Sequence, residues 1–189
     1  MSISRSIMRT PLTGAACLAG VARHGMMRFL PLFIATILCS AACAGHKTKM
    51  SSSEATQAIA RLRGAYAAFN RGDMDAAVAA LDPQIEWSEP AEFPGGGAYH
   101  GRDQVKQYLT QSRANWAEGS SEPVQFIPSG NRVVVFVHAR FRLKDSNDWQ
   151  VVDLADVYTV HENKIVAMRA FANRQEALRW AGVEDSEVK

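Results

Sequence analysis

Residues 132–144 read Arg132-Val133-Val134-Val135-Phe136-Val137-His138-Ala139-Arg140-Phe141-Arg142-Leu143-Lys144. The odd-numbered side chains from Val133 to Leu143 are all apolar, whereas the even-numbered set includes His138, Arg140 and Arg142. Because successive side chains of a β-strand point to opposite faces, this alternation predicts a strand with its apolar face turned inward. A sheet that buries one face and exposes the other is typically antiparallel.

Strand-like runs on both sides of this segment extend the predicted sheet. They cover about 123–129, 149–161 and 164–173, with turns at Gly130-Asn131, 145–148 and Glu162-Asn163. In 149–161 the even-numbered face is slightly the more apolar, so we expect it to point inward. That orientation places Asp156 among apolar neighbours, where desolvation raises the pKa of a carboxyl.

Helical patterns precede the sheet. Apolar side chains recur at steps of three and four at Ile59, Leu62, Tyr66 and Phe69, which predicts one helix that ends at Gly72. A second, short helix begins after Asp73, and Pro83 is expected to stop it.

A short strand and a loop separate these helices from the rest. Ile85, Trp87 and Glu89 alternate with polar residues and predict the strand, and 90–97 is rich in proline and glycine and predicts the loop. A third helix is expected from about 101–103, with Trp116 on its apolar side, and a last one over 174–181. Helices followed by an antiparallel meander indicate an α+β fold, with N-terminal helices packed on a curved antiparallel sheet.

The first fifty residues are typical of an exported protein. Arg28 precedes an apolar run over 29–38, and small residues follow, so 1–43 are predicted to be a signal peptide whose true start is Met26 or Met27. Ser40-Ala41-Ala42-Cys43 resembles a bacterial lipobox, which would make Cys43 the lipidated N-terminus, although ordinary cleavage also fits. We expect a periplasmic or membrane-anchored lipoprotein, or alternatively a secreted protein, with 44–53 as a flexible tether and any membrane contact through the lipid.

Composition narrows the classes of ligand. The chain has 189 residues, 47% hydrophobic and 21% charged, which suits one globular domain. Four of its 21 basic residues precede Cys43, so the body carries 17 basic and 19 acidic residues and no basic run, which argues against nucleic-acid binding. The body has no cysteine and its histidines lack metal-binding spacing, so we expect neither a metal nor a cofactor.

Five short motifs resemble SnoaL-like proteins of the nuclear transport factor 2-like superfamily, which includes ketosteroid isomerase. They are Tyr66-Ala67-Ala68-Phe69-Asn70-Arg71-Gly72-Asp73-Met74-Asp75, Ile85-Glu86-Trp87, Tyr99-His100-Gly101-Arg102-Asp103-Gln104-Val105, Asp156-Val157-Tyr158-Thr159-Val160 and Lys164-Ile165-Val166-Ala167-Met168-Arg169-Ala170-Phe171. The resemblance covers 54–182 and leaves 183–189 as a C-terminal tail. It implies a cone-shaped curved sheet around an apolar pocket, and a homodimer formed through the sheet.

The resemblance carries over only part of the isomerase site. Asp156 falls at the position of the protonated oxyanion-hole aspartate. The place of the oxyanion-hole tyrosine holds Ala65, one residue before Tyr66, and the place of the general base holds Trp87. Glu89 lies two residues beyond it, on the same strand face, and is a candidate displaced base. We therefore do not infer steroid isomerisation.

Other candidate residues have alternative readings. His100 is either a base beside the glycine-rich loop or a surface histidine, and Asp156 is either an acid/base group or a buried carboxyl bonded to Tyr66 or Tyr99. The aromatic and sulfur-containing side chains either line a pocket or fill the core; they are Tyr66, Trp87, Tyr99, Phe141, Tyr158 and Met168.

Three functions follow from these residues. The first is binding of a small apolar or aromatic molecule without assured catalysis. The second is an isomerase, cyclase or dehydratase acting on a hydrophobic carbonyl compound through Asp156 with Glu89 or His100. The third is a protein-interaction module that uses the outer face of the sheet. We rank the first narrowly above the second.

Overall fold

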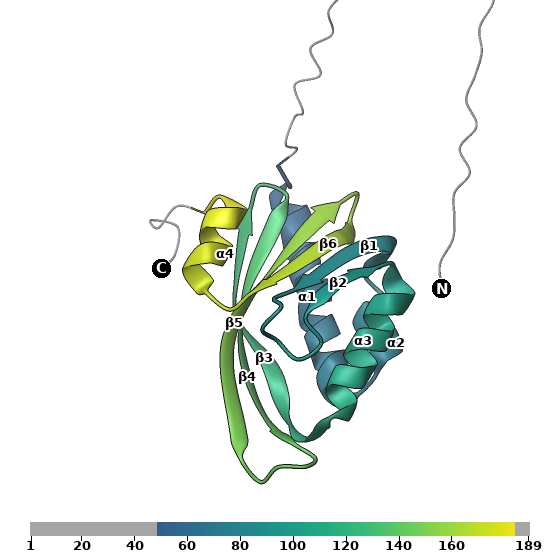
Figure 1. Cartoon of the computed structure of the whole chain (residues 1–189). Helices are drawn as coiled ribbons and strands as arrows, with labels where there is room; N and C mark the ends of the chain where they lie inside the picture. The colour runs from purple at the N-terminus through teal and green to yellow at the C-terminus, as the bar shows by residue number, and fades with distance from the viewer. Residues whose placement is uncertain (1–48, 184–189) are drawn as a thin grey trace, which may run out of the picture. The chain divides into compact units, whose positions relative to one another are not determined.

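The computed structural model describes residues 49–183 (Figure 1). The helices are α1 (Ser52–Arg71), α2 (Met74–Val78), α3 (Arg102–Ala114) and α4 (Arg174–Ala181). The strands are β1 (Leu81–Glu89), β2 (Gly97–His100), β3 (Trp116–Ser129), β4 (Arg132–Leu143), β5 (Trp149–His161) and β6 (Lys164–Phe171). The predicted signal peptide, Cys43 and half of the predicted tether, 44–48, lie outside the described residues. Within 49–183, no helix combines the length and apolarity needed to span a bilayer.

The sheet has six strands in the order β2-β1-β6-β5-β4-β3. Strands β3 to β6 form the predicted antiparallel meander. The sheet as a whole is mixed, because β1 pairs with β6 in parallel and β2 pairs with β1 in antiparallel fashion. This pairing joins segments about eighty residues apart in the sequence, which no local pattern could have indicated. Strand β2 forms at the end of the predicted loop, where it covers the otherwise open edge of β1.

The inner face of the sheet is the one that the alternation predicted. Val133 and Val135 of β4 lie opposite Tyr158 and Asp156 of β5, and both valines are completely buried. Helices α1 and α3 cover this face, with Leu62 and Val105 in its core (Figure 1). Each fully buried aliphatic side chain of this kind stabilises the fold by about 1.5–3 kcal/mol.

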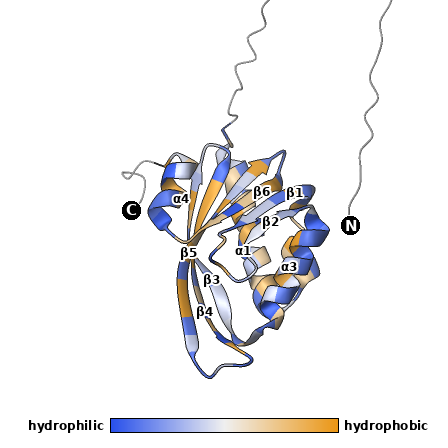
Figure 2. Ribbon diagram, viewed as in Figure 1, coloured by the Kyte–Doolittle hydropathy of each residue, from blue (hydrophilic) through white to orange (hydrophobic). Residues whose placement is uncertain are grey.

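The outer face is less exposed than the alternation indicated. Val134 and Phe136 belong to a second apolar cluster with Ala155, Val157 and Leu178, because α4 packs across β4, β5 and β6. Figure 2 shows hydrophilic residues on the outer sides of α3 and α4 and hydrophobic residues along the strands. Val183 is buried in the same cluster, so the first residue of the predicted tail packs against the domain. The homodimer expected through this sheet stays a prediction.

Helix α1 is bounded by strong local signals. Ser51 and Glu54 form a capping box, with the Ser51 amide donating to a Glu54 carboxylate oxygen at 2.8 Å. Gly72 ends the helix with φ 79°, a left-handed conformation that favours glycine. Since the helix begins at Ser52, the last two residues of the predicted tether are helical.

Two element boundaries differ from the sequence analysis. Helix α2 ends at Val78, and Pro83 lies within β1 instead of stopping the helix. Pro83 is tolerated there because the β1–β6 register shifts between Leu81 and Glu86, so the missing amide costs no paired bond. Trp116 opens β3 and is not part of the third helix, so β3 begins seven residues earlier than predicted.

Candidate functional site

A network of two hydroxyls and one carboxyl lies on the inner face of the sheet. Asp156 is the one buried charged residue in the described part of the chain, at 8% exposure. The Tyr66 hydroxyl of α1 donates to Asp156 Oδ2 at 2.5 Å, and the Tyr158 hydroxyl lies 3.0 Å from that of Tyr66. Either hydroxyl can be the donor in the contact between Tyr66 and Tyr158, and Tyr158 also hydrogen bonds to Asp156. The three groups form a continuous chain of hydrogen bonds.

Burial and hydrogen bonding act on Asp156 in opposite directions. Desolvation raises the pKa of Asp156 to about 6, although hydrogen bonds from Tyr66 and Tyr158 lower it in part. The pKa values of both tyrosines are raised well above their usual range, chiefly by burial and by the nearby negative charge of Asp156. Both hydroxyls therefore remain protonated donors at every physiological pH.

A second carboxyl joins this network from β1. The Trp87 indole N–H donates to Glu89 Oε1 at 2.7 Å, which fixes the carboxyl beside the indole ring. Desolvation and, second to it, the charge of Asp156 raise the pKa of Glu89 to about 8, against an opposing effect of hydrogen bonds from Trp87 and Tyr108. Glu89 is thus close enough to Asp156 for the two ionisations to be coupled.

The two carboxyls differ in protonation near pH 7. Asp156 ionises first because hydrogen bonds from Tyr66 and Tyr158 partly offset its desolvation, whereas desolvation and then the charge of Asp156 keep the proton on Glu89. In this order Asp156 is the acceptor and Glu89 the proton donor, whereas the sequence analysis considered Asp156 as an oxyanion or acid/base group and Glu89 as a base; the catalytic roles stay predictions. One buried acceptor and one partly buried proton donor in a single cluster are suited to acid/base chemistry on one ligand.

Comparison with known proteins places this arrangement in a family. The family model of the SnoaL-like domain matches residues 62–168, more than half of the chain. The chain belongs to this family.

Solved structures agree with the family assignment. A nuclear transport factor 2-like protein from Burkholderia xenovorans is 31% identical, with 70% of this chain and 98% of that chain covered and a TM-score of 0.54. One of unknown function from Burkholderia pseudomallei is 26% identical, with 70% and 98% covered and a TM-score of 0.56. TerC, crystallised with polyporic acid, is 22% identical, with 66% of this chain and 97% of that chain covered and a TM-score of 0.55. At this identity the similarity supports the fold alone. No curated protein matches the chain.

The SnoaL-like fold brings most of the predicted lining residues together. Trp87 lies opposite Tyr99 of β2 and Met168 of β6, and Met168 lies opposite Tyr158 of β5. The Trp87 and Tyr158 rings meet edge to face at 6.3 Å. Trp87, Tyr158 and Met168 are each less than 10% exposed, so they pack tightly around the two carboxyls.

Three predicted residues have other surroundings. The Tyr99 hydroxyl donates to the Gly95 carbonyl and not to Asp156. Phe141 stacks on Trp116 at 4.4 Å, in an aromatic group separate from the carboxyl network. His100 is exposed and lies opposite Glu86, on the strand face that points away from Trp87 and Tyr99, so the structure does not bring it to the carboxyls.

Of two contacts in the SnoaL-like site, the sequence analysis offered the first as an alternative and missed the second. Tyr66 reaches Asp156 although it stands one residue beyond the family position, so the hydroxyl partner is present after all. Tyr108 of α3 hydrogen bonds to Glu89 and its ring stacks on Tyr99 at 4.5 Å. The sequence signal for Tyr108 was its position three residues after the buried Val105, which places both side chains on the same face of α3.

Two hollows are open on the surface of the domain, and neither is lined by the carboxyls. One lies on α3, and the other lies between α1 and β3 and is lined in part by Tyr66. Within residues 49–183, no three metal-ligating side chains of His, Cys, Asp or Glu gather closely enough to hold an ion.

Proposed function

We propose that this SnoaL-like domain binds a small apolar or aromatic molecule through an oxygen atom that hydrogen bonds to the Tyr66–Asp156–Tyr158 network. The observation that carries the proposal is the 2.5 Å bond between Tyr66 and the buried Asp156. A buried ionisable group is costly for stability, and such groups concentrate at functional sites.

The protonation states of Asp156 and Glu89 indicate which polar groups the ligand carries. An ionised Asp156 accepts a hydrogen bond from an acidic O–H, such as that of a phenol or an enol. A protonated Glu89 donates to a carbonyl oxygen. The surrounding rings of Trp87 and Tyr158 provide apolar contact area, so an aromatic hydroxy compound matches both the polar and the apolar parts of the cluster.

Thermal unfolding of the purified protein with 2-naphthol tests this proposal. A ligand that binds the folded state raises the Tm by mass action, and we expect that rise to disappear in Asp156→Asn. Asp145→Asn makes the same chemical change at an exposed turn and is the matched control, which should keep the rise. An equal rise in all three proteins, or none in any, would contradict the proposal.

A second candidate function is proton transfer on a hydrophobic carbonyl compound. The observation that favours it is the pair of coupled carboxyls with pKa values raised to about 6 and about 8. In this reaction Asp156 removes a proton from the carbon beside the carbonyl, while Glu89 gives its proton to the oxygen, which leaves a neutral enol.

Deuterium exchange into 2-tetralone, followed by NMR, tests for that reaction. We expect exchange above the buffer rate, with a maximum between pH 6 and 8, because Asp156 must be ionised and Glu89 protonated. Exchange at the buffer rate throughout this range, with binding intact, would leave ligand binding as the function.

A further inference from the structure

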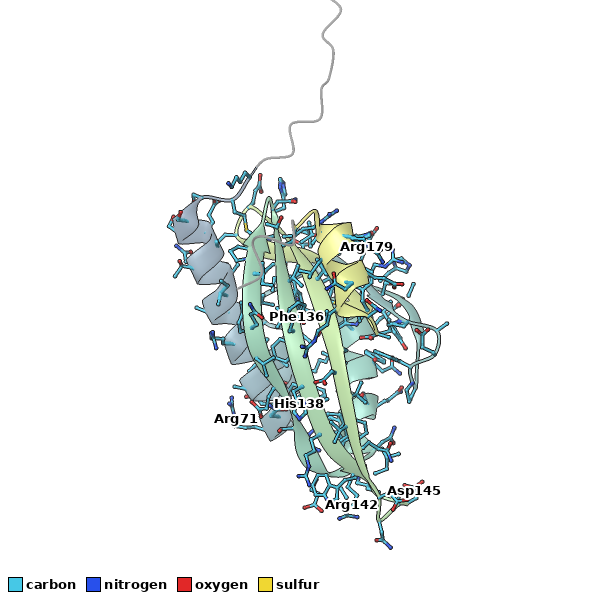
Figure 3. The ribbon with its side chains drawn as sticks, turned by 90° about the vertical axis from the view of Figure 1, so that its left-hand side faces the viewer. Arg71, Phe136, His138, Arg142, Asp145 and Arg179 are labelled. Atoms are coloured by element: carbon cyan, nitrogen blue, oxygen red, sulfur yellow. The ribbon has the colours of Figure 1, made fainter. Side chains whose placement is uncertain are left out.

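The groove between α1 and β3 is a second recognition surface beside the buried network. Its volume is about 440 Å³, within the range of small-molecule sites. Helix α1 packs along β3, and Figure 3 shows Arg71 at the end of that helix. The groove is lined by Arg63, Tyr66, Ala67, Asn70 and Arg71 of α1 and by Glu122 and Pro123 of β3.

The walls of this groove are held in place by specific contacts. The side-chain Nδ2 of Asn70 donates to the backbone carbonyl of Ser121 at 3.0 Å, and the backbone amide of Ser121 donates to Asn70 Oδ1 at 2.8 Å. These two hydrogen bonds connect the end of α1 to the edge strand β3. The Arg63 guanidinium lies over the Phe126 ring, 4.3 Å from its centre, which restricts that side chain as well. These contacts hold Asn70 and Arg63 in place, so binding costs little ordering of these two side chains.

The groove carries more positive than negative charge. Arg63 and Arg71 are exposed, and within residues 49–183 neither has a carboxylate within 4.0 Å. Arg142, by contrast, is paired with Glu118. Glu122 is the single acidic residue of the lining, and it lies 3.4 Å from the Asn70 amide nitrogen. The groove consequently has an excess of one positive charge and two guanidinium groups suited to a carboxylate.

Tyr66 connects this groove to the buried network. Its side chain lines the groove, and its hydroxyl donates to Asp156. We propose that the groove between α1 and β3 binds the carboxylate of the ligand through Arg63 and Arg71, so that the preferred ligand is an aromatic hydroxy acid whose hydroxyl reaches Tyr66. This inference rests on the proposed binding function and adds the anionic part of the ligand.

Calorimetric titration with a matched pair of compounds tests the inference. 2-Naphthol and 6-hydroxy-2-naphthoate share the ring and the hydroxyl and differ by the carboxylate. We expect the carboxylate to lower the Kd about tenfold at low ionic strength, and added salt to reduce this factor. In Arg63→Gln and in Arg71→Gln the ratio of the two Kd values should fall towards one. Arg179→Gln on α4 removes the same charge far from the groove and should keep the ratio.

The outcomes separate this inference from the proposed function. If 2-naphthol binds and the carboxylate adds no affinity, or if the Arg179→Gln variant loses as much as the groove variants, the groove inference is overturned and the buried site stands. If only 6-hydroxy-2-naphthoate binds, and binding depends on Arg63 and Arg71 but not on the Tyr66 hydroxyl, the groove stands and the proposed function fails. If neither compound binds, both are overturned.

Discussion

Replacing Glu89 with glutamine should remove most of the pH dependence of stability above pH 6. Glutamine has nearly the same shape as glutamate, and its side-chain oxygen can still accept the Trp87 indole N–H, which Glu89 accepts at 2.7 Å. The substitution therefore removes a titrating group from the cluster while leaving its packing in place. The change isolates the cost of ionising a carboxyl beside Asp156.

The magnitude follows from the raised pKa of Glu89. This pKa rises from its ordinary value of 4.5 to about 8 in the folded protein, so the folded state holds the proton more tightly than the unfolded chain. The resulting stability is fully present below pH 4.5 and is lost as the pH rises towards 8. At about 1.4 kcal/mol per pH unit, the wild type should lose up to about 4 kcal/mol between pH 5 and pH 8. Asp156 adds a smaller loss below pH 6.

Urea unfolding at pH 5, 6, 7 and 8 measures this difference. Between pH 6 and pH 8 we expect the free energy of unfolding to fall in the wild type and to remain nearly constant in Glu89→Gln, which becomes the more stable protein at pH 8. Glu86→Gln, at an exposed position of the same strand, is the matched control and should follow the wild type. Parallel pH profiles of the wild type and Glu89→Gln would refute the assignment of a partly buried, protonated carboxyl at position 89.

Three further predictions concern other parts of the chain. Tyr66→Phe removes the donor to Asp156 and should raise the pKa of that carboxyl, measured by carbon NMR, and lower stability at pH 7 by about 1–2 kcal/mol; an unchanged pKa would contradict the hydrogen bond. Gly96→Ala would place a Cβ 2.0 Å from the backbone carbonyl across the loop and should cost about 1–3 kcal/mol in urea unfolding, whereas Gly64→Ala meets no atom within 4 Å and should not destabilise the protein. Cys43→Ala should abolish fatty-acid labelling of the exported protein, and labelling that persists, or a wild-type mature mass without lipid, would disprove the lipobox hypothesis.

The sequence predicted those features that depend on neighbouring residues. The alternation over 132–144 and 149–161 identified two strands and their inner faces, and thereby placed Asp156 inside the domain. The capping box at Ser51 and the glycine at position 72 bounded α1. These signals are local because side-chain direction and helix capping are determined within a few residues of the chain.

Part of the candidate site was also visible in the sequence. Trp87 and Glu89 share one strand face at a spacing of two, and the structure joins them by a hydrogen bond. For Asp156 the sequence offered Tyr66 or Tyr99 as the partner and could not decide between them. Tyr66 lies ninety residues before it, and one position along a helix rotates a side chain by about 100°, so reach across the core depends on how the helix sits on the sheet.

The sequence by itself determined the α+β layout, the order of the four helices and of every strand except β2, and the inward direction of Asp156. Only the tertiary structure decided that β1 pairs in parallel with β6, that α4 covers part of the outer face, and that Asp156 and Glu89 belong to one cluster. The physical reason is that strand pairing, packing and the coupling of two charges depend on distances between segments far apart in the chain. Such distances arise only when the whole core is assembled.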